Sequence, residues 1–197
     1  MTTELQYGQT YHIYNRGNNG ENLFRNEENY RYFLRLYLKH FHPIAETYAY
    51  CLLPNHFHFA VRIRAKSEIL ALDQSGFRNQ TGLKQPTPSR KFGNLCVAYT
   101  KSINKAYERT GSLFESPFHR KAVHDDAYFY NLITYIHQNP QQHRFVDDFR
   151  DWPFTNYIAI LADSRTNIAR DQILDWFDGK ERFEEAHNTN IDLNLDL

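Results

Sequence analysis

Hydrophobic and polar residues alternate strictly from residue 56 to residue 64, which is the period of a β-strand with one buried face. The apolar face of this predicted strand is formed by Phe57, Phe59, Val61 and Ile63. Successive strand side chains point to opposite sides, so the other face carries His56, His58, Ala60, Arg62 and Arg64. The two imidazoles are therefore expected about 7 Å apart on one face, close enough to share a metal ion.

A His-x-His pair on a strand has more than one interpretation. Many such pairs are two solvated imidazoles, and others belong to zinc hydrolases or cupin-type oxygenases. The spacing alone therefore does not name a chemistry.

The apolar pattern predicts further strands and helices on either side of this segment. Strands are expected over residues 10–16, 44–53 and 114–124. Helices are expected over residues 26–40, 91–109 and 125–138. Asn26 is placed to cap the first helix, and Asn139-Pro140 is expected to end the third. The turn at Pro54-Asn55 makes a hairpin of the strands before and after it.

This order of elements predicts an α+β fold. A four-stranded antiparallel sheet with two helices on one face, ferredoxin-like or RRM-like, fits it. The other face would carry His56 and His58 and would be open to a strand of nucleic acid.

The chain is expected to divide into a main domain and an extension. Residues 1–150 form the domain, within which residues 65–90, rich in Ser, Gln, Pro, Gly and Thr, are expected to be a mobile loop. Residues 151–187 are expected to dock on this domain through a helix near residues 169–177. Residues 188–197 are polar and are expected to be a frayed tail.

The net charge of zero conceals an asymmetry. Residues 1–124 carry 17 Lys/Arg against 9 Asp/Glu, a net charge of +8, and residues 125–197 carry 6 against 14, a net charge of −8. This split favours a basic binding surface with an acidic C-terminal segment, although both can also be ordinary solvated surfaces.

Cysteine content and hydropathy exclude some classes of protein. Two cysteines without a CxxC indicate neither a disulfide framework nor a zinc knuckle. No apolar run approaches a membrane span and the N-terminus is not a signal peptide, so a cytoplasmic protein without a membrane partner is expected.

The third predicted helix carries a second, polar stripe, on which Asn131, Tyr135 and Asn139 lie at i, i+4 and i+8. If this helix crosses the sheet near the histidines, the Asn139 amide oxygen suits a hard cation as a third ligand. Tyr135 would then be a nucleophile, its phenolate favoured by the cation against a usual pKa of roughly 10. The alternative is an ordinary tyrosine among 14. His137 is expected to be a solvated helix residue or a spare ligand.

Several motifs together resemble a known family. The strand LPNHFHFAVRIR resembles the HUH motif (His, bulky hydrophobe, His) of single-tyrosine transposases of the insertion-sequence type. With YHIYNRG, NKAYERTGSLFESPFHRKAV and YIHQNPQQHRFV, it is similar to their REP-associated relatives, in which a Tyr-Ile-x-x-Asn-Pro segment carries the catalytic tyrosine. WPFTNY resembles the family's Trp/Tyr-Pro-x-Ser-Ser-Tyr stretch, so the resemblance runs from about Tyr11 to Phe177. The family's commoner Pro-Val-Arg-Ala-Gly is replaced here by PQQHR.

The resemblance implies His56 and His58 as ligands of Mg²⁺ or Mn²⁺, Tyr135 as the nucleophile and Asn139 as a further ligand. It implies cleavage and rejoining of single-stranded DNA near hairpins through a 5′-phosphotyrosine. Tyr135 would act within its own subunit or across a homodimer, since both arrangements occur among such proteins.

Four basic residues are candidates for holding phosphates beside the cut. These are Arg62 and Arg64 on the histidine face, with Arg16 and Lys121 at strand ends.

Two rival functions remain. A non-catalytic module that binds single-stranded nucleic acid would keep the sheet and need no metal. A metal-dependent phosphodiesterase using water would turn over without a covalent protein–DNA species.

Overall fold

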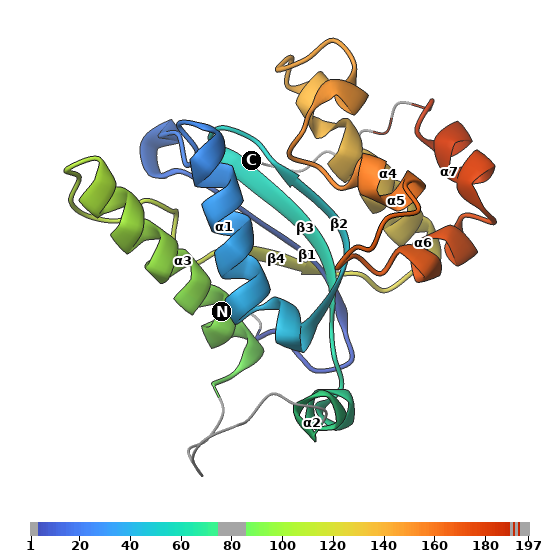
Figure 1. Ribbon diagram of the computed structural model, residues 1–197, viewed down its shortest axis with the longest axis horizontal. Helices are drawn as coiled ribbons and strands as arrows, with labels where there is room; N and C mark the ends of the chain where they lie inside the picture. The colour runs from blue at the N-terminus through green and yellow to red at the C-terminus, as the bar shows by residue number, and fades with distance from the viewer. Residues whose placement is uncertain (1–3, 75–85, 190, 192, 194–197) are drawn as a thin grey trace.

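Four antiparallel strands form a sheet, and the sequence predicted each of them. They are β1 (Thr10–Arg16), β2 (Ala45–Leu52), β3 (His56–Ile63) and β4 (His119–Ala122). Their order across the sheet is β2-β3-β1-β4 (Figure 1). This computed structural model describes residues 4–74, 86–189, 191 and 193. The predicted α+β class is confirmed.

Helices lie on both faces of the sheet (Figure 1). They are α1 (Glu27–His40), α2 (Lys66–Gln74), α3 (Pro88–Ala106), α4 (Asp126–Gln142), α5 (Tyr157–Leu161), α6 (Arg170–Trp176) and α7 (Lys180–Ala186). Short 3-10 turns lie at Asn18–Gly20, His42–Ile44 and Phe149–Asp151. Helices α1 and α3 cover one face, and α4 to α7 gather on the other (Figure 1). Within the described ranges, no helix is both long and apolar enough to cross a bilayer.

The first hydrophobic core lies between the sheet and the helices α1 and α3. The predicted buried face of β3 is fully enclosed there and consists of Phe57, Phe59, Val61 and Ile63. The Phe57 ring centroid lies 5.4 Å from that of Phe33 on α1 and 6.0 Å from that of Phe92 on α3. Asn26 caps α1 as predicted, its side chain accepting a hydrogen bond of 3.1 Å from the Asn29 amide.

A second core lies on the opposite face, where α4 packs on β2 and β3. Ala60 of β3 and Tyr48 of β2 are buried in it together with Ile136 of α4. The segment after residue 151 joins this core through Ile173 and Phe177, which are both buried, whereas Trp176 of the same helix, also expected to dock, is 49% exposed. The histidine face was expected to be open to nucleic acid, and over β2 and β3 that expectation is wrong, because the apolar side of α4 covers it.

A buried polar cluster joins β2, α4 and α7. The Asn156 amide oxygen accepts a 2.6 Å hydrogen bond from the Tyr50 amide and lies 3.1 Å from His137 Nε2 on α4. His137 Nδ1 lies 2.8 Å from Nε2 of His187, the residue that follows α7. His137 is thus not the solvated residue that was expected, because it is fully buried and ties α4 to its neighbours.

The predicted frayed tail is held where the structure describes it. The Gln138 side-chain amide of α4 donates to the carbonyls of His187 at 2.9 Å and Thr189 at 2.7 Å. Its oxygen accepts from the Ile191 amide at 3.1 Å. The prediction of a frayed tail is therefore wrong for these residues, because Gln138 satisfies their backbone groups. The tail at 190, 192 and 194–197 lies outside the described residues.

The predicted mobile loop over residues 65–90 is also partly wrong. Residues 66–74 form α2, whose first turn is stabilised by Glu68 as it accepts from the Ala65 amide and pairs with Arg62 at 2.7 Å. Helix α3 begins at Pro88, with Thr87 accepting from the Arg90 amide. Residues 75–85, on which the rest of that prediction falls, lie outside the described residues.

Two predicted boundaries differ from the structure near proline residues. Strand β4 is shorter than predicted, and Pro117, which lacks an N–H, precedes it. Helix α4 continues through Pro140, where it was expected to stop. Pro140 cannot donate to the Ile136 carbonyl, yet the next turn forms because the His143 amide donates to the Asn139 carbonyl at 2.9 Å. The extra turn brings His143 toward the sheet.

Two glycines should respond in opposite ways to alanine. A Cβ on Gly17 would lie 1.9 Å from the Glu21 carbonyl oxygen, whereas a Cβ on Gly93 of α3 would have no atom within 4 Å. We expect Gly17→Ala to lower the free energy of unfolding by about 1–3 kcal/mol through overpacking. Gly93→Ala should raise it by about 0.5–1 kcal/mol through helix propensity. Urea unfolding measures both, and equal effects would contradict the Gly17 geometry.

Candidate active site

The two histidines of β3 lie at the start of that strand, beside β1. Arg16 of β1 is the register partner of His56, and Tyr14 is the partner of His58. His56 is 5% exposed and His58 is not exposed at all. Their ring centroids lie 5.3 Å apart. The structure therefore brings both imidazoles together under α4 and excludes the interpretation of two solvated histidines.

Helix α4 places Tyr135 and Asn139 beside these two histidines. The Tyr135 ring meets that of His58 edge to face at a centroid distance of 5.7 Å. Asn139 is fully buried, and its side-chain nitrogen donates to the Tyr135 carbonyl at 3.1 Å. Because that contact uses the nitrogen, the amide oxygen of Asn139 is left for another partner. Three predicted metal ligands and the predicted nucleophile thus meet between one strand and one helix.

Several buried atoms of this cluster have no hydrogen-bond partner in the described part of the chain. They are His12 Nδ1, His56 Nε2, His58 Nε2 and Asn139 Oδ1. Buried polar atoms are nearly always paired, so a cluster of unpaired ones calls for a ligand. Imidazole nitrogens and an amide oxygen are donors that Mg²⁺ or Mn²⁺ accepts. The residues present therefore fit a divalent cation.

The third donor distinguishes this cluster from a simple histidine site. Within residues 4–74, 86–189, 191 and 193, no three His, Cys, Asp or Glu side chains are placed to hold one metal ion. A site with three protein ligands would therefore depend on the Asn139 oxygen, leaving other positions of the cation to solvent or substrate.

His12 of β1 was not singled out from the sequence, yet it contacts the site directly. Its Nε2 lies 2.9 Å from Nδ1 of His58, and both side chains are fully buried. A neutral imidazole has one donor and one acceptor nitrogen, so this hydrogen bond fixes which nitrogen of His58 carries the proton. If His12 accepts, His58 Nδ1 carries the proton and His58 Nε2 is free to bind a cation.

His143 is a second residue that the sequence analysis passed over. Its exposed ring meets that of His56 at a centroid distance of 4.7 Å. It lies four residues after Asn139, which is one helical turn, but the expected helix end at Pro140 hid that relation.

Burial sets the protonation of the imidazoles. It lowers the pKa of His12 to about 3, with a smaller effect of Lys121. It lowers the pKa of His56 to about 4, helped by His143 and Arg16 and opposed by the neighbouring Asn139 side chain. The pKa of His58 lies well below its usual value, again mainly through burial and then through His12. All three are therefore neutral at pH 7, which is the form that binds metal.

The four basic residues predicted to hold phosphates are divided between two places. Arg16 and Lys121 lie close to the histidines, Arg16 opposite His56 and Lys121 opposite His12. Arg62 lies six residues along β3 from His56, about 20 Å away, and Arg64 lies beyond it.

Carboxylates already pair most of these cations. Arg62 pairs with Glu46 at 2.8 Å and Glu68 at 2.7 Å, and Arg64 pairs with Glu46 at 2.8 Å. Arg16 pairs with Glu115 at 2.6 Å. Lys121 instead lies over the Tyr128 ring, with its Nζ 4.3 Å from the centroid.

The free energy of unfolding should fall on acidification, because the unfolded chain binds protons that the folded one excludes. The unfolded imidazoles have an ordinary pKa of 6.5. Protonation of His12 and of His56 in the unfolded chain should therefore each lower the free energy of unfolding by about 2 kcal/mol between pH 7 and about pH 5. Urea unfolding with a chelator present measures the loss, and His56→Leu should make the dependence shallower. A stability that does not change over this range would contradict the burial of these imidazoles.

The sequence of the whole chain was compared with those of known proteins. No family model matches the chain. A protein of Haemophilus influenzae named as a REP-associated tyrosine transposase is 25% identical over 112 residues, which are 57% of this chain and 58% of that protein. The chain therefore aligns with little more than half the length of this relative.

A solved structure has the same fold. It is a REP-associated tyrosine transposase bound to a REP hairpin, with a TM-score of 0.59 and 16% identity over 83% of this chain and 85% of that chain. Together, the aligned relative and the shared fold confirm the resemblance to REP-associated tyrosine transposases that the four motifs indicated.

Proposed function

We propose that this chain is a metal-dependent tyrosine transposase that cleaves and rejoins single-stranded DNA near hairpins. The observation that carries the proposal is the set of unpaired buried atoms on His56, His58 and Asn139, gathered beside Tyr135. A module that only binds nucleic acid has no need of three such residues beside a tyrosine in one buried place.

In the proposed reaction, the Tyr135 oxygen attacks the scissile phosphorus. A Tyr135 O–P bond forms, the bond from phosphorus to the 3′ oxygen breaks, and that oxygen leaves as a 3′ hydroxyl after taking a proton. The phosphodiester energy is kept in the 5′-phosphotyrosine, so a second 3′ hydroxyl can reverse the step and join strands without ATP.

A cation bound by His56, His58 and Asn139 would supply charge stabilisation at the phosphate. The protein's own part is orientation. His12 fixes the His58 ring, and the hydrogen bond from Asn139 to the Tyr135 carbonyl holds the Asn139 oxygen away from α4. Tyr135 is 6% exposed, so its cover has to move for a phosphate to reach it.

The proposed DNA partner is a single strand with a hairpin, by analogy with the relative of the same fold that is bound to one. Arg16 and Lys121, next to the histidines, would hold phosphates adjoining the cut. Arg62 and Arg64 would reach DNA only by exchanging their carboxylate partners. A homodimer is also part of the proposal, although Tyr135 and His58 already meet within one chain and need no residue from a second subunit.

A covalent adduct tests the nucleophile. With Mn²⁺ and a labelled single-stranded hairpin DNA taken from sequence flanking the gene, we expect a slowly migrating labelled band on a denaturing gel. Tyr135→Phe should abolish the band, because only the attacking oxygen is removed. His56→Ala/His58→Ala should reduce the band by at least about 100-fold, since a lost electrostatic stabiliser typically costs that much.

Tyr130→Phe is the matched control, because Tyr130 lies on the same helix and stacks on Phe177, a contact that phenylalanine keeps. It should leave the band unchanged. Cleavage that survives Tyr135→Phe would instead support a hydrolase that uses water. A salt-sensitive gel shift without cleavage of any flanking hairpin would support the binding module.

Metal affinity tests the ligand set without catalysis. We expect Mn²⁺ binding, measured by isothermal titration calorimetry, to weaken about tenfold or more in Asn139→Leu, which keeps the volume and loses the oxygen. His12→Phe should weaken it by about 10–100-fold through loss of the partner of His58. Wild-type affinity in both variants would exclude Asn139 as a ligand and His12 as the residue that supports His58.

A further inference from the structure

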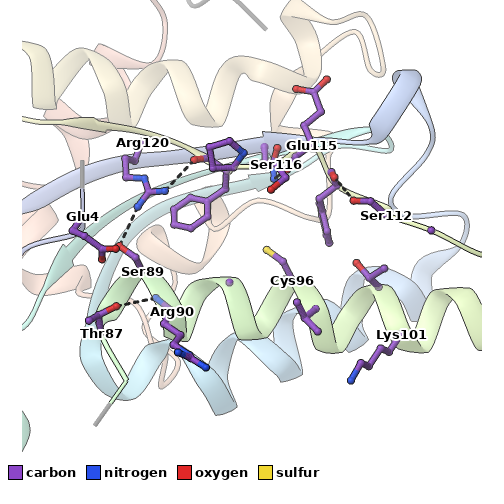
Figure 2. Close-up of a pocket in the computed structure, with 18 of the residues that line it drawn as sticks. Glu4, Thr87, Ser89, Arg90, Cys96, Lys101, Ser112, Glu115, Ser116 and Arg120 are labelled. Carbon is purple, nitrogen blue, oxygen red and sulfur yellow. Dashed lines mark hydrogen bonds between the residues drawn. The ribbon is translucent and has the colours of Figure 1, made fainter. Parts of the chain in front are cut away.

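A wide groove runs between α3 and the segment over residues 111–120, on the side of the sheet away from the histidines (Figure 2). Its volume is about 970 Å³. The α3 wall is one stripe at helical spacing, made of Arg90, Gly93, Val97, Lys101 and Asn104. The opposite wall presents Ser112, Ser116, Pro117, Phe118 and Arg120.

The cations of this groove differ from those chosen from the sequence. Helix α3 contains Arg90, Lys91, Lys101 and Lys105 and no Asp or Glu. Arg90 and Lys101 are exposed, and neither forms an ion pair with another residue in the described part of the chain. Arg62, Arg64 and Arg16 are all paired with carboxylates. Part of the positive charge that is available to a partner therefore lies on α3.

The acidic residues of the groove are already engaged. Glu115 pairs with Arg16 at 2.6 Å, and Glu4 lies close enough to Arg120 to act on its pKa. Arg120 also donates to the Ser89 hydroxyl at 3.0 Å, while its buried Nε has no partner among the described residues (Figure 2). Arg90 and Lys101 project from α3 away from the opposite wall (Figure 2), so they give the groove a positive surplus along its α3 rim, which favours an anionic ligand.

The remaining lining suits a sugar–phosphate chain. The hydroxyls of Thr100 and Ser116 can donate to phosphate oxygens. Val97, 53% exposed, and the rings of Pro117 and Phe118 offer apolar surface to deoxyribose. Gly93 leaves the middle of the α3 wall open, since a Cβ there would have no atom within 4 Å.

The groove ends near the candidate active site. Glu115 lines it and holds Arg16, and Arg16 is the register partner of His56. The Asn15 side chain, also in the lining, donates to the Glu115 carbonyl at 3.0 Å. A DNA strand that leaves the histidine cluster beside Arg16 would therefore pass the edge of the sheet and enter the groove.

We propose that this groove binds the sugar–phosphate backbone of the DNA that flanks the cleavage position, with Arg90 and Lys101 as its phosphate contacts. The proposal rests on the proposed function and adds a second DNA surface to it. The two cations are eleven residues apart on α3, about 16 Å, which is the axial length of about five phosphates of one strand.

Salt dependence tests the contacts. Tyr135→Phe serves as the background so that no DNA is cleaved, and the probe is a fluorescein-labelled DNA hairpin with single-stranded flanks. Anisotropy then gives the slope of log K against log salt. We expect Arg90→Ala/Lys101→Ala to weaken binding severalfold and to reduce the slope by about 0.7–0.9 for each contact.

Lys39→Ala is the matched control, because Lys39 is an exposed lysine of α1 outside the groove. Its slope should equal that of the background protein. If the double variant also keeps that slope while the background binds the probe, the groove proposal is overturned and the proposed function stands. If the background protein does not bind the probe at all, both fail.

A steric variant tests the position independently of charge. Gly93→Tyr adds a ring that meets no protein atom near its Cβ but occupies the groove. We expect it to fold, as judged by circular dichroism, and to lose at least tenfold in DNA affinity, while Gly93→Ala binds normally. Normal binding by Gly93→Tyr would overturn the proposal.

Discussion

The position of α4 on the sheet is the constraint on which the rest of the structure depends. Apolar contacts alone would let a helix slide or rotate, but the Asn156 amide specifies one position by bonding to the Tyr50 amide, the Tyr48 carbonyl and His137. The cost of leaving such buried polar groups unpaired is what makes this position specific. Tyr135 and Asn139 lie on either side of His137, so the same contacts that hold the helix also aim its reactive residues.

Local patterns predicted much of this architecture, and long-range contacts account for what they missed. The alternation around His56 and His58 and the cap at Asn26 depend on neighbours in the chain, and both are confirmed. The contact between His12 and His58 depends on the register of two strands 46 residues apart, which no local spacing encodes. His143 was hidden by a rule about proline that holds in most helices but not in the last turn of α4. Burial of His137 depends on His187, from the far end of the chain.

The ion pairs in the structure change how the charge asymmetry of the sequence is interpreted. A count of Lys and Arg treats all of them alike, yet ion pairs with Glu46, Glu68 and Glu115 neutralise the arginines nearest the histidine motif. The Glu46 carboxylate is only 12% exposed and pairs with both Arg62 and Arg64, so these pairs fix the local geometry. Part of the unneutralised charge lies on α3, most of which lies outside the motifs that carry the family resemblance. Electrostatic attraction of a polyanion can therefore act at α3, whereas the candidate active site lies on the opposite face of the sheet.

The separation of the protein into two cores has a consequence for how it moves. The core under α1 and α3 contains none of the candidate site residues, whereas the one under α4 to α7 includes Tyr135. Cooperative units of a protein open with different free energies, and an opening confined to the second core would uncover Tyr135 while the first stays intact. Hydrogen exchange of α4 amides would then report on access to Tyr135, and exchange of α1 amides on global unfolding. The sheet would separate the core that stays folded from the core that opens.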